Sequence, residues 1–182
     1  MNRIVVLTVG KTHSGKTTFA GKLESRLKNA VVIDQDNHAA FINTCYQSLR
    51  PKEGPNTLKY AVTQTIVDYA VQQTDCHLIL CNSNLAQEGR KNLLDYFRLK
   101  GFISVLVYFD IPDEVLQSRI AESQRSKAIF RSASSFDEVL ARQQLNRTPA
   151  PEEGEADYLF KVSRSEDDIP TVIENILKLS EK

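Results

Sequence analysis

The sequence has no excess of charge of either sign, since 23 lysines and arginines balance 23 aspartates and glutamates. Proteins that hold a long nucleic acid across a surface usually carry a net positive field that attracts the phosphates. The balanced charge therefore argues against such a partner, although a local basic groove would still be compatible with it.

Long hydrophobic runs and a cysteine framework are also missing. No segment approaches the about 18 apolar residues that span a bilayer. The first apolar run, residues 4–9, is too short for a secretory signal. The three cysteines, Cys45, Cys76 and Cys81, are an odd number without metal-ligand spacing. They are typical of reduced thiols, so we expect a cytoplasmic protein that does not associate with membranes.

What the chain does contain is a regular alternation of apolar runs and helical patterns. With 182 residues, 41% of them apolar, it is of a size that suits one domain. Buried apolar runs separated by helices are typical of a parallel sheet that is covered on both faces. We therefore predict one doubly wound α/β domain, residues 1–182, with a five-stranded parallel sheet. The expected strands lie at residues 4–9, 31–33, 77–81, 103–109 and 158–162.

Helices are expected between these strands. Residues 17–28 form the first of them, Leu58 and Ile66 belong to another, and Pro112 opens a third. Ser135 and Glu138 have the spacing of a capping box. A final helix is predicted to begin at Pro170, because proline is favoured at the first helical position.

The first strand leads into a complete GxxxxGK[ST] phosphate-binding loop. Its residues are Gly10, Lys11, Thr12, His13, Ser14, Gly15, Lys16 and Thr17, followed by Thr18. The glycines let successive backbone N–H groups turn toward a phosphate chain, and the following helix contributes its positive N-terminus. Lys16 supplies a cation for the β- and γ-phosphates, and Thr17 supplies a hydroxyl for Mg²⁺. Because a strand precedes the motif and a helix follows it, we predict binding of a nucleoside triphosphate.

Two further groups of residues have the chemistry of phosphoryl transfer. Asp34 and Asp36 follow the second strand, where a carboxylate can accept a hydroxyl proton or hold Mg²⁺ through water. The structural alternative is that an aspartate here caps a helix. Arg119 and Arg125 lie in a basic segment that could stabilise charge on the transferred phosphoryl group. The structural alternative for them is a solvated helix face.

Together these residues resemble the P-loop kinases related to the kinase domain of polynucleotide 5′-kinases, over nearly the whole chain. The phosphate loop is the specific part of the resemblance. The other anchors are weaker and gain weight from their order: residues 32–36, 78–85, 108–112 leading into Arg119 and Arg125, and 151–157.

The resemblance implies ATP and Mg²⁺ as cofactors and assigns roles to the candidate residues. Asp36 aligns with the general base, with Asp34 as the next candidate and as a metal contact. Arg119 and Arg125 align with arginines of a lid that closes over ATP. The resemblance also implies a substrate lid near residues 37–75 and an ATP lid near 119–132.

Two departures from that family concern the acceptor. Asn82 stands where the family usually has an aspartate, and an amide carries no charge. Residues 37–40, Asn-His-Ala-Ala, lack the basic residue with which a polynucleotide kinase grips its substrate. We therefore favour a small hydroxylated molecule over a polynucleotide as the acceptor.

The alternative class is a switch or a non-catalytic binding module. A small GTPase needs an Asn/Thr-Lys-x-Asp run, which the sequence does not contain. A motor ATPase needs an Asp-Glu pair at the end of the third strand, where Cys81 and Asn82 stand. A non-catalytic ATP-binding protein stays open, because the missing carboxylate is compatible with lost activity.

Overall fold

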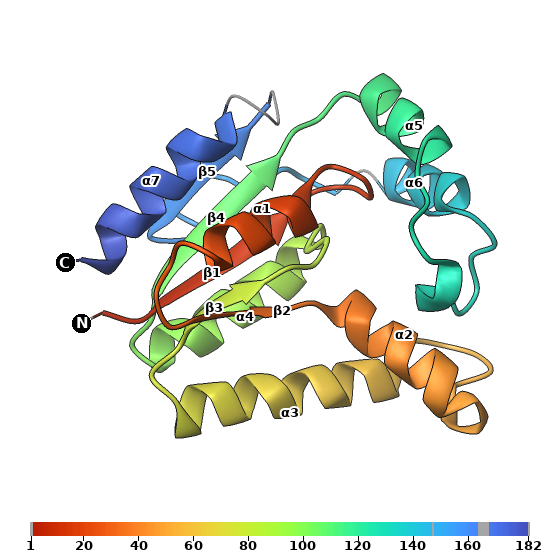
Figure 1. The fold of residues 1–182 in the computed structure, drawn as a ribbon, viewed down its shortest axis with the longest axis horizontal. Coiled ribbons are helices and arrows are strands. Elements are labelled where there is room, and N and C mark those ends of the chain that lie inside the picture. The colour runs from red at the N-terminus through yellow and green to blue at the C-terminus, as the bar shows by residue number, and fades with distance from the viewer. Residues whose placement is uncertain (1, 147, 164–167, 182) are drawn as a thin grey trace.

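The fold is a five-stranded parallel sheet with helices on both faces, as the sequence predicts (Figure 1). The structure is a computed structural model, which describes residues 2–146, 148–163 and 168–181. All strand pairs are parallel, in the order β2-β3-β1-β4-β5. The strands are β1 (Ile4–Val9), β2 (Ala30–Ile33), β3 (His77–Leu80), β4 (Ile103–Phe109) and β5 (Tyr158–Val162).

Seven α-helices and two short 3₁₀ turns, η1 and η2, connect or follow the strands in the described part of the chain. The helices are α1 (Lys16–Glu24), α2 (Gln35–Cys45), α3 (Thr57–Gln73), α4 (Gln87–Leu99), α5 (Asp113–Ala121), α6 (Phe136–Leu145) and α7 (Asp168–Ser180). The 3₁₀ turns are η1 (Gln47–Leu49) and η2 (Lys127–Ile129).

Two predicted helix boundaries are wrong. The first helix ends at Glu24 rather than Lys28, because the chain tightens there into a three-residue turn in which Arg26 N donates to Leu23 O at 3.1 Å. The last helix begins at Asp168, two residues before Pro170. Proline is tolerated there because the first turn of a helix needs no intrahelical N–H donor.

The core lies on both faces of the sheet, and β1 contributes to both. Ile4 and Val6 pack in the cluster that includes residues of α1 and α7, whereas Val5 and Leu7 pack with α3 and α4. This alternation follows from the two-residue period of a strand. Burial on both faces explains why the strands read as continuous apolar runs.

The central position of β1 determines where a ligand can bind. Its carboxyl end leads into the phosphate loop, with β3 and β4 as its neighbours in the sheet. In Figure 1, α2 and the start of α3 lie on one side beyond the strand ends, and α5, η2 and α6 lie on the other. Ligands of such sheets bind outside the carboxyl ends of the strands.

Two further features of the described residues concern membrane-spanning helices and disulfide bonds. Among the described residues, no helix has both the length and the apolar character needed to cross a membrane. Cys45, Cys76 and Cys81 are all free thiols.

Candidate active site

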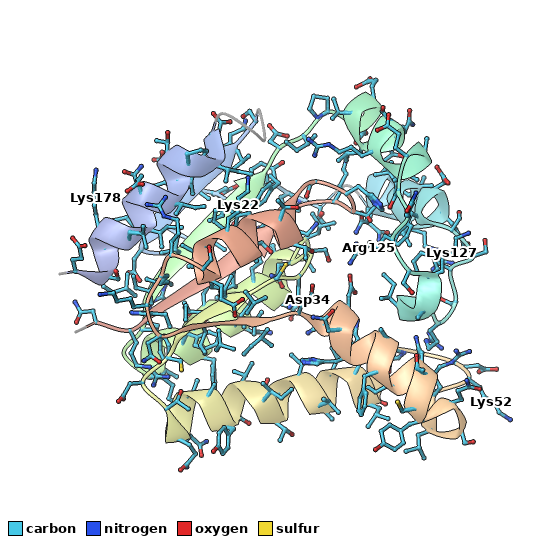
Figure 2. The ribbon with its side chains drawn as sticks, viewed as in Figure 1. Lys22, Asp34, Lys52, Arg125, Lys127 and Lys178 are labelled. Atoms are coloured by element: carbon cyan, nitrogen blue, oxygen red, sulfur yellow. The ribbon has the colours of Figure 1, made fainter. Side chains whose placement is uncertain are left out.

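The phosphate loop borders a cavity of about 790 Å³. Elements far apart in the sequence form its walls: the loop itself, the starts of α2 and α3, the segment after β3, and the α5–α6 region. Figure 2 shows Asp34 and Arg125 reaching the same part of the molecule from different elements. The predicted residues that line the cavity are Thr12, His13, Ser14, Gly15, Lys16, Thr17, Thr18, Asp36, Arg119 and Arg125.

The glycines of the loop allow its backbone to curl. A Cβ at Gly10 would lie 2.9 Å from both Phe109 Cβ and Ser14 Oγ, so only glycine fits between them. Gly15 has a φ of 98° and is the N-cap of α1, and no side chain caps this helix end. The first N–H groups of α1 are therefore left for a ligand, and with the helix dipole they favour an anion.

Lys16 and His13 offer polar groups to the cavity. The Lys16 ammonium donates to Lys11 O at 2.5 Å and to Ser14 Oγ at 3.2 Å, so it folds over the loop. Burial lowers the pKa of Lys16 to about 8. His13 Nε2 is buried and has no hydrogen-bond partner among the described residues. Burial, followed by the nearby Arg125 and Lys16, lowers the pKa of His13, so its ring is neutral at pH 7. An unpartnered polar atom beside open N–H groups fits a bound triphosphate.

Thr17 lies in contact with an unexpected partner. The Cys81 thiol donates to Thr17 Oγ1 at 3.7 Å, and burial raises the pKa of that thiol to about 11, with Asp34 contributing. A neutral thiol therefore stands beside the predicted Mg²⁺ ligand. The described residues contain no cluster of three or more His, Cys, Asp or Glu side chains that could hold a metal.

Asp34 and Asp36 have different environments. Asp34 is the N-cap of α2, with its Oδ1 accepting from Asp36 N at 2.8 Å, and only 5% of the residue is exposed. Burial raises the pKa of Asp34 despite this bond. The structural alternative is therefore realised at Asp34, which does not line the cavity, whereas the half-exposed Asp36 does.

The run after β3 fixes the start of α2 and the phosphate loop. Asn82 Oδ1 accepts from Gln35 N at 3.1 Å, so this amide caps the helix that carries Asp36. Ser83 O accepts from Gly10 N at 3.0 Å, and Asn84 Nδ2 donates to Thr8 O at 2.9 Å. The residue that replaces the family's aspartate thus holds the backbone of the site in position.

The two predicted arginines both reach the cavity. Arg119, near the end of α5, donates from a guanidinium N–H to His13 O at 3.2 Å. Arg125 forms an ion pair with Asp36 at 2.7 Å, and its guanidinium lies 5.5 Å from the centre of the Phe136 ring. The candidate base and a lid arginine therefore neutralise each other in this structure.

Lys11 and Gly10 face elsewhere. They line a second cavity of about 270 Å³, and the Lys11 ammonium pairs with Asp113 at 2.6 Å.

The cavity at the phosphate loop is also lined by residues that the sequence pattern does not reveal. Gln143 Oε1 accepts from Thr12 N at 2.7 Å, and Lys59 enters from α3. No local motif marks either residue, since both come close only through packing of the helices.

Solved structures with a similar fold include Kti12 and several kinases. Kti12 from Chaetomium thermophilum, in complex with ADP-AlF3, matches with a TM-score of 0.67 and 16% identity, covering 96% of this chain and 97% of that one. A sugar kinase from Janibacter sp. matches with a TM-score of 0.61, 18% identity and coverage of 100% and 95%. The APS kinase CysC from Mycobacterium tuberculosis, in complex with AMPPNP and APS, matches with a TM-score of 0.60, 18% identity and coverage of 100% and 99%.

The sequence comparisons give a family. A comparison with curated protein sequences yields no match. The sequence profile of the family described as AAA domain matches residues 5–149, which include the phosphate loop, Asp36, Arg119 and Arg125. With a P-loop kinase-like fold and a matching profile over most of its length, the chain belongs to this AAA domain family.

Proposed function

We propose that this protein is an ATP-dependent phosphotransferase that moves the γ-phosphoryl group of Mg·ATP to a hydroxyl of a small molecule. The observation that carries the proposal is the convergence of Lys16, Asp36, Arg119 and Arg125 on one cavity at the phosphate loop. A cation, a carboxylate and two guanidinium groups are the parts that phosphoryl transfer requires.

The donor half of the site consists of the loop residues 10–17 and Thr18. The loop N–H groups and the Lys16 ammonium would bind the phosphates, and Thr17 would hold Mg²⁺, with Asp34 acting through water. When bound there, Mg²⁺ would neutralise phosphate charge and orient the transferred group. The Gln143 contact to Thr12 N would hold the loop in its curled form.

The acceptor half centres on Asp36. Asp36 would accept the hydroxyl proton while the acceptor oxygen forms its bond to the γ-phosphorus and the bond to ADP breaks. Because Arg125 pairs with Asp36 in this structure, that pair must open before Asp36 can act as a base. The released Arg125 would then join Arg119 in stabilising the transferred phosphoryl group.

A small acceptor fits the site better than a polynucleotide does. Residues 37–40 contain no lysine or arginine, and the net charge is zero with histidine neutral. A sugar kinase and an APS kinase are among the structures with this fold.

The three free thiols also fit the cytoplasmic location that we infer.

The test is phosphoryl transfer from γ-labelled ATP to a panel of sugars, nucleosides, aminoglycosides and oligonucleotides. We expect Asp36→Asn to reduce transfer by about 10²-fold or more while ATP binding stays near that of the wild type. Lys16→Ala should weaken ATP binding and turnover together. Full transfer by the Asp36→Asn variant would overturn the assignment of the base.

A second candidate is an ATP-binding switch without an acceptor. The observation that favours it is the neutral Cys81 thiol beside Thr17, where motor ATPases place a carboxylate. Slow ATP hydrolysis that no compound of the panel stimulates would support this candidate. Acceptor-dependent consumption of ATP would exclude it.

A further inference from the structure

The cavity at the phosphate loop is strongly cationic. Asp36 is the one carboxylate among its described lining residues. The cationic side chains that line it are Lys16, Lys22, Lys59, Arg119 and Arg125. The positive charge therefore exceeds what a single Mg·ATP and Asp36 require, which raises the question of what the remaining cations bind.

Four of these five cations already have a reason for their position. Lys16 belongs to the phosphate loop, Arg119 contacts His13 O, and Arg125 pairs with Asp36. Lys22 lies in the last turn of α1, where the negative end of the helix dipole stabilises a cation. Lys59 is left over.

Lys59 occupies a position that helix stability disfavours. It lies in the first turn of α3, at the positive end of the helix dipole, and that turn contains no acidic residue. It is half-buried, and none of the described residues forms an ion pair with it. Its ammonium lies 5.0 Å from the centre of the Tyr60 ring, which is a weak interaction at an exposed site.

The backbone around Lys59 is nevertheless held firmly. Its N–H donates to Asn56 Oδ1 at 3.2 Å, and its carbonyl accepts from Thr63 Oγ1 at 2.9 Å. The same Thr63 hydroxyl lies 2.8 Å from His38 Nδ1 on α2. This chain of bonds ties the first turns of α3 to α2, two residues from Asp36.

We propose that the acceptor carries an oxyanion, such as a phosphate or a carboxylate, in addition to its reacting hydroxyl, and that Lys59 binds this oxyanion. The inference rests on the proposed function and deepens it. With Asp36 at the hydroxyl and Lys59 at the oxyanion, two walls of one cavity orient a small molecule at two points. A cation held where local forces disfavour it acquires its counter-charge only when the acceptor is bound.

The first experiment compares matched acceptors in which an oxyanion replaces one terminal hydroxyl or hydroxymethyl group. The pairs are glycerol with glycerol 3-phosphate, ribose with ribose 5-phosphate, adenosine with AMP, and glucose with glucuronate. The enzymes are the wild type, Lys59→Met, Lys59→Arg and, as a matched control, Lys52→Met. Lys52 is an exposed lysine of the α2–α3 connection that lies outside the cavity lining (Figure 2).

We expect transfer to the anionic member of at least one pair. Its KM should rise about tenfold in Lys59→Met, recover in Lys59→Arg and stay unchanged in Lys52→Met. The KM for ATP should not change in any of these variants. Transfer that prefers the neutral members, or a Lys59→Met effect on ATP alone, would overturn the inference while the proposed function stands.

A binding experiment separates the two proposals if no acceptor is phosphorylated. Inorganic phosphate and the anionic compounds are titrated calorimetrically into protein saturated with Mg²⁺ and AMPPNP. Binding that Lys59→Met weakens and Lys52→Met preserves would retain the anion site although the proposed transfer fails. Absence of binding by every anion, or binding that is equal in Lys59→Met, would refute the site.

Discussion

At the scale of single residues, Lys16 shows how the site is arranged before a ligand binds. Its ammonium donates hydrogen bonds to Lys11 O and Ser14 Oγ, within the phosphate loop to which Lys16 itself belongs. Burial holds its pKa at about 8, and Arg125 acts in the same direction, whereas Asp36 and Asp34 act in the opposite one. The amine is therefore close to half protonated at pH 8.

Binding of Mg·ATP should consequently take up protons. Phosphate oxygens favour the ammonium form and raise the pKa of Lys16 again, so a protein that is partly neutral at pH 8 gains a proton on binding. Between pH 7 and pH 9 the Kd for ATP should rise about tenfold, with an uptake of about half a proton at pH 8. Calorimetry in buffers of different ionisation enthalpy measures this uptake.

The control for this pH dependence is Lys16→Arg, because a guanidinium stays charged throughout the range. We expect its ATP affinity to be nearly independent of pH between 7 and 9. An uptake of the same size in Lys16→Arg, or none in the wild type, would assign the proton to another group.

Of the residues that line the cavity, those that lie in recognisable motifs could be predicted, and those that only helix packing brings there could not. Gly10 to Thr17 form a contiguous motif whose geometry depends on backbone conformation, and Asp36 follows from its place after a strand. Lys59 and Gln143 reach the cavity only because α3 and α6 pack as they do. The cap formed by Asn82 likewise depends on the neighbouring ends of β2 and β3.

At the scale of elements, the two predicted lid regions are joined to each other. Asn43 on α2 is 7% exposed, and its Nδ2 donates to Ala128 O at 2.7 Å and to Phe130 O at 3.2 Å. Arg131 donates to Pro51 O at 3.1 Å and also to Gly54 O. The segment that carries Arg125 is therefore attached to the element that carries Asp36.

Loss of the Asn43 bonds should uncouple these two segments. AMPPNP binding is expected to slow amide hydrogen exchange both in residues 123–131 and in α2 of the wild type. In Asn43→Ala the protection of α2 should fall by about 1–2 kcal/mol, the contribution of two hydrogen bonds, while protection of the phosphate loop remains.

Asn37→Ala is the matched control, since Asn37 is an exposed residue of the same helix. Its exchange pattern should equal that of the wild type. Equal protection of α2 in the Asn43→Ala variant would show that the segments respond to the nucleotide independently.

Helix ends were predictable where a side chain caps the helix locally. Ser135 Oγ accepts from Glu138 N at 3.2 Å, as the spacing predicts. The Glu138 carboxylate, however, bonds Ser134 rather than the backbone of Ser135, so only half of the capping box forms. The end of α1 depends on a turn that carries no such local signal.

At the scale of the whole molecule, the strand pattern predicted the sheet because burial on both faces leaves continuous apolar runs. The strand pattern did not predict the order of the strands or the contacts between distant loops. Arg90 on α4 makes one such contact. It is fully buried and forms a two-point ion pair with Glu155, at 2.9 and 3.0 Å. It also donates to Leu85 O at 2.6 Å and Asn84 O at 3.2 Å.

Removal of Arg90 should therefore destabilise the fold. Arg90→Met removes the guanidinium that donates to the Glu155 carboxylate and to three backbone carbonyls, which should cost about 3–5 kcal/mol of unfolding free energy in urea titrations. Arg98→Met is the control, because Arg98 pairs with Asp95 in solvent, and it should cost less than about 1 kcal/mol. Since Arg90 lowers the pKa of Glu155, this contribution should fade as the pH falls through that lowered value. The double variant Arg90→Met with Glu155→Leu should recover part of the lost unfolding free energy. An equal loss of unfolding free energy in Arg90→Met and Arg98→Met would show that the buried ion pair adds no stability.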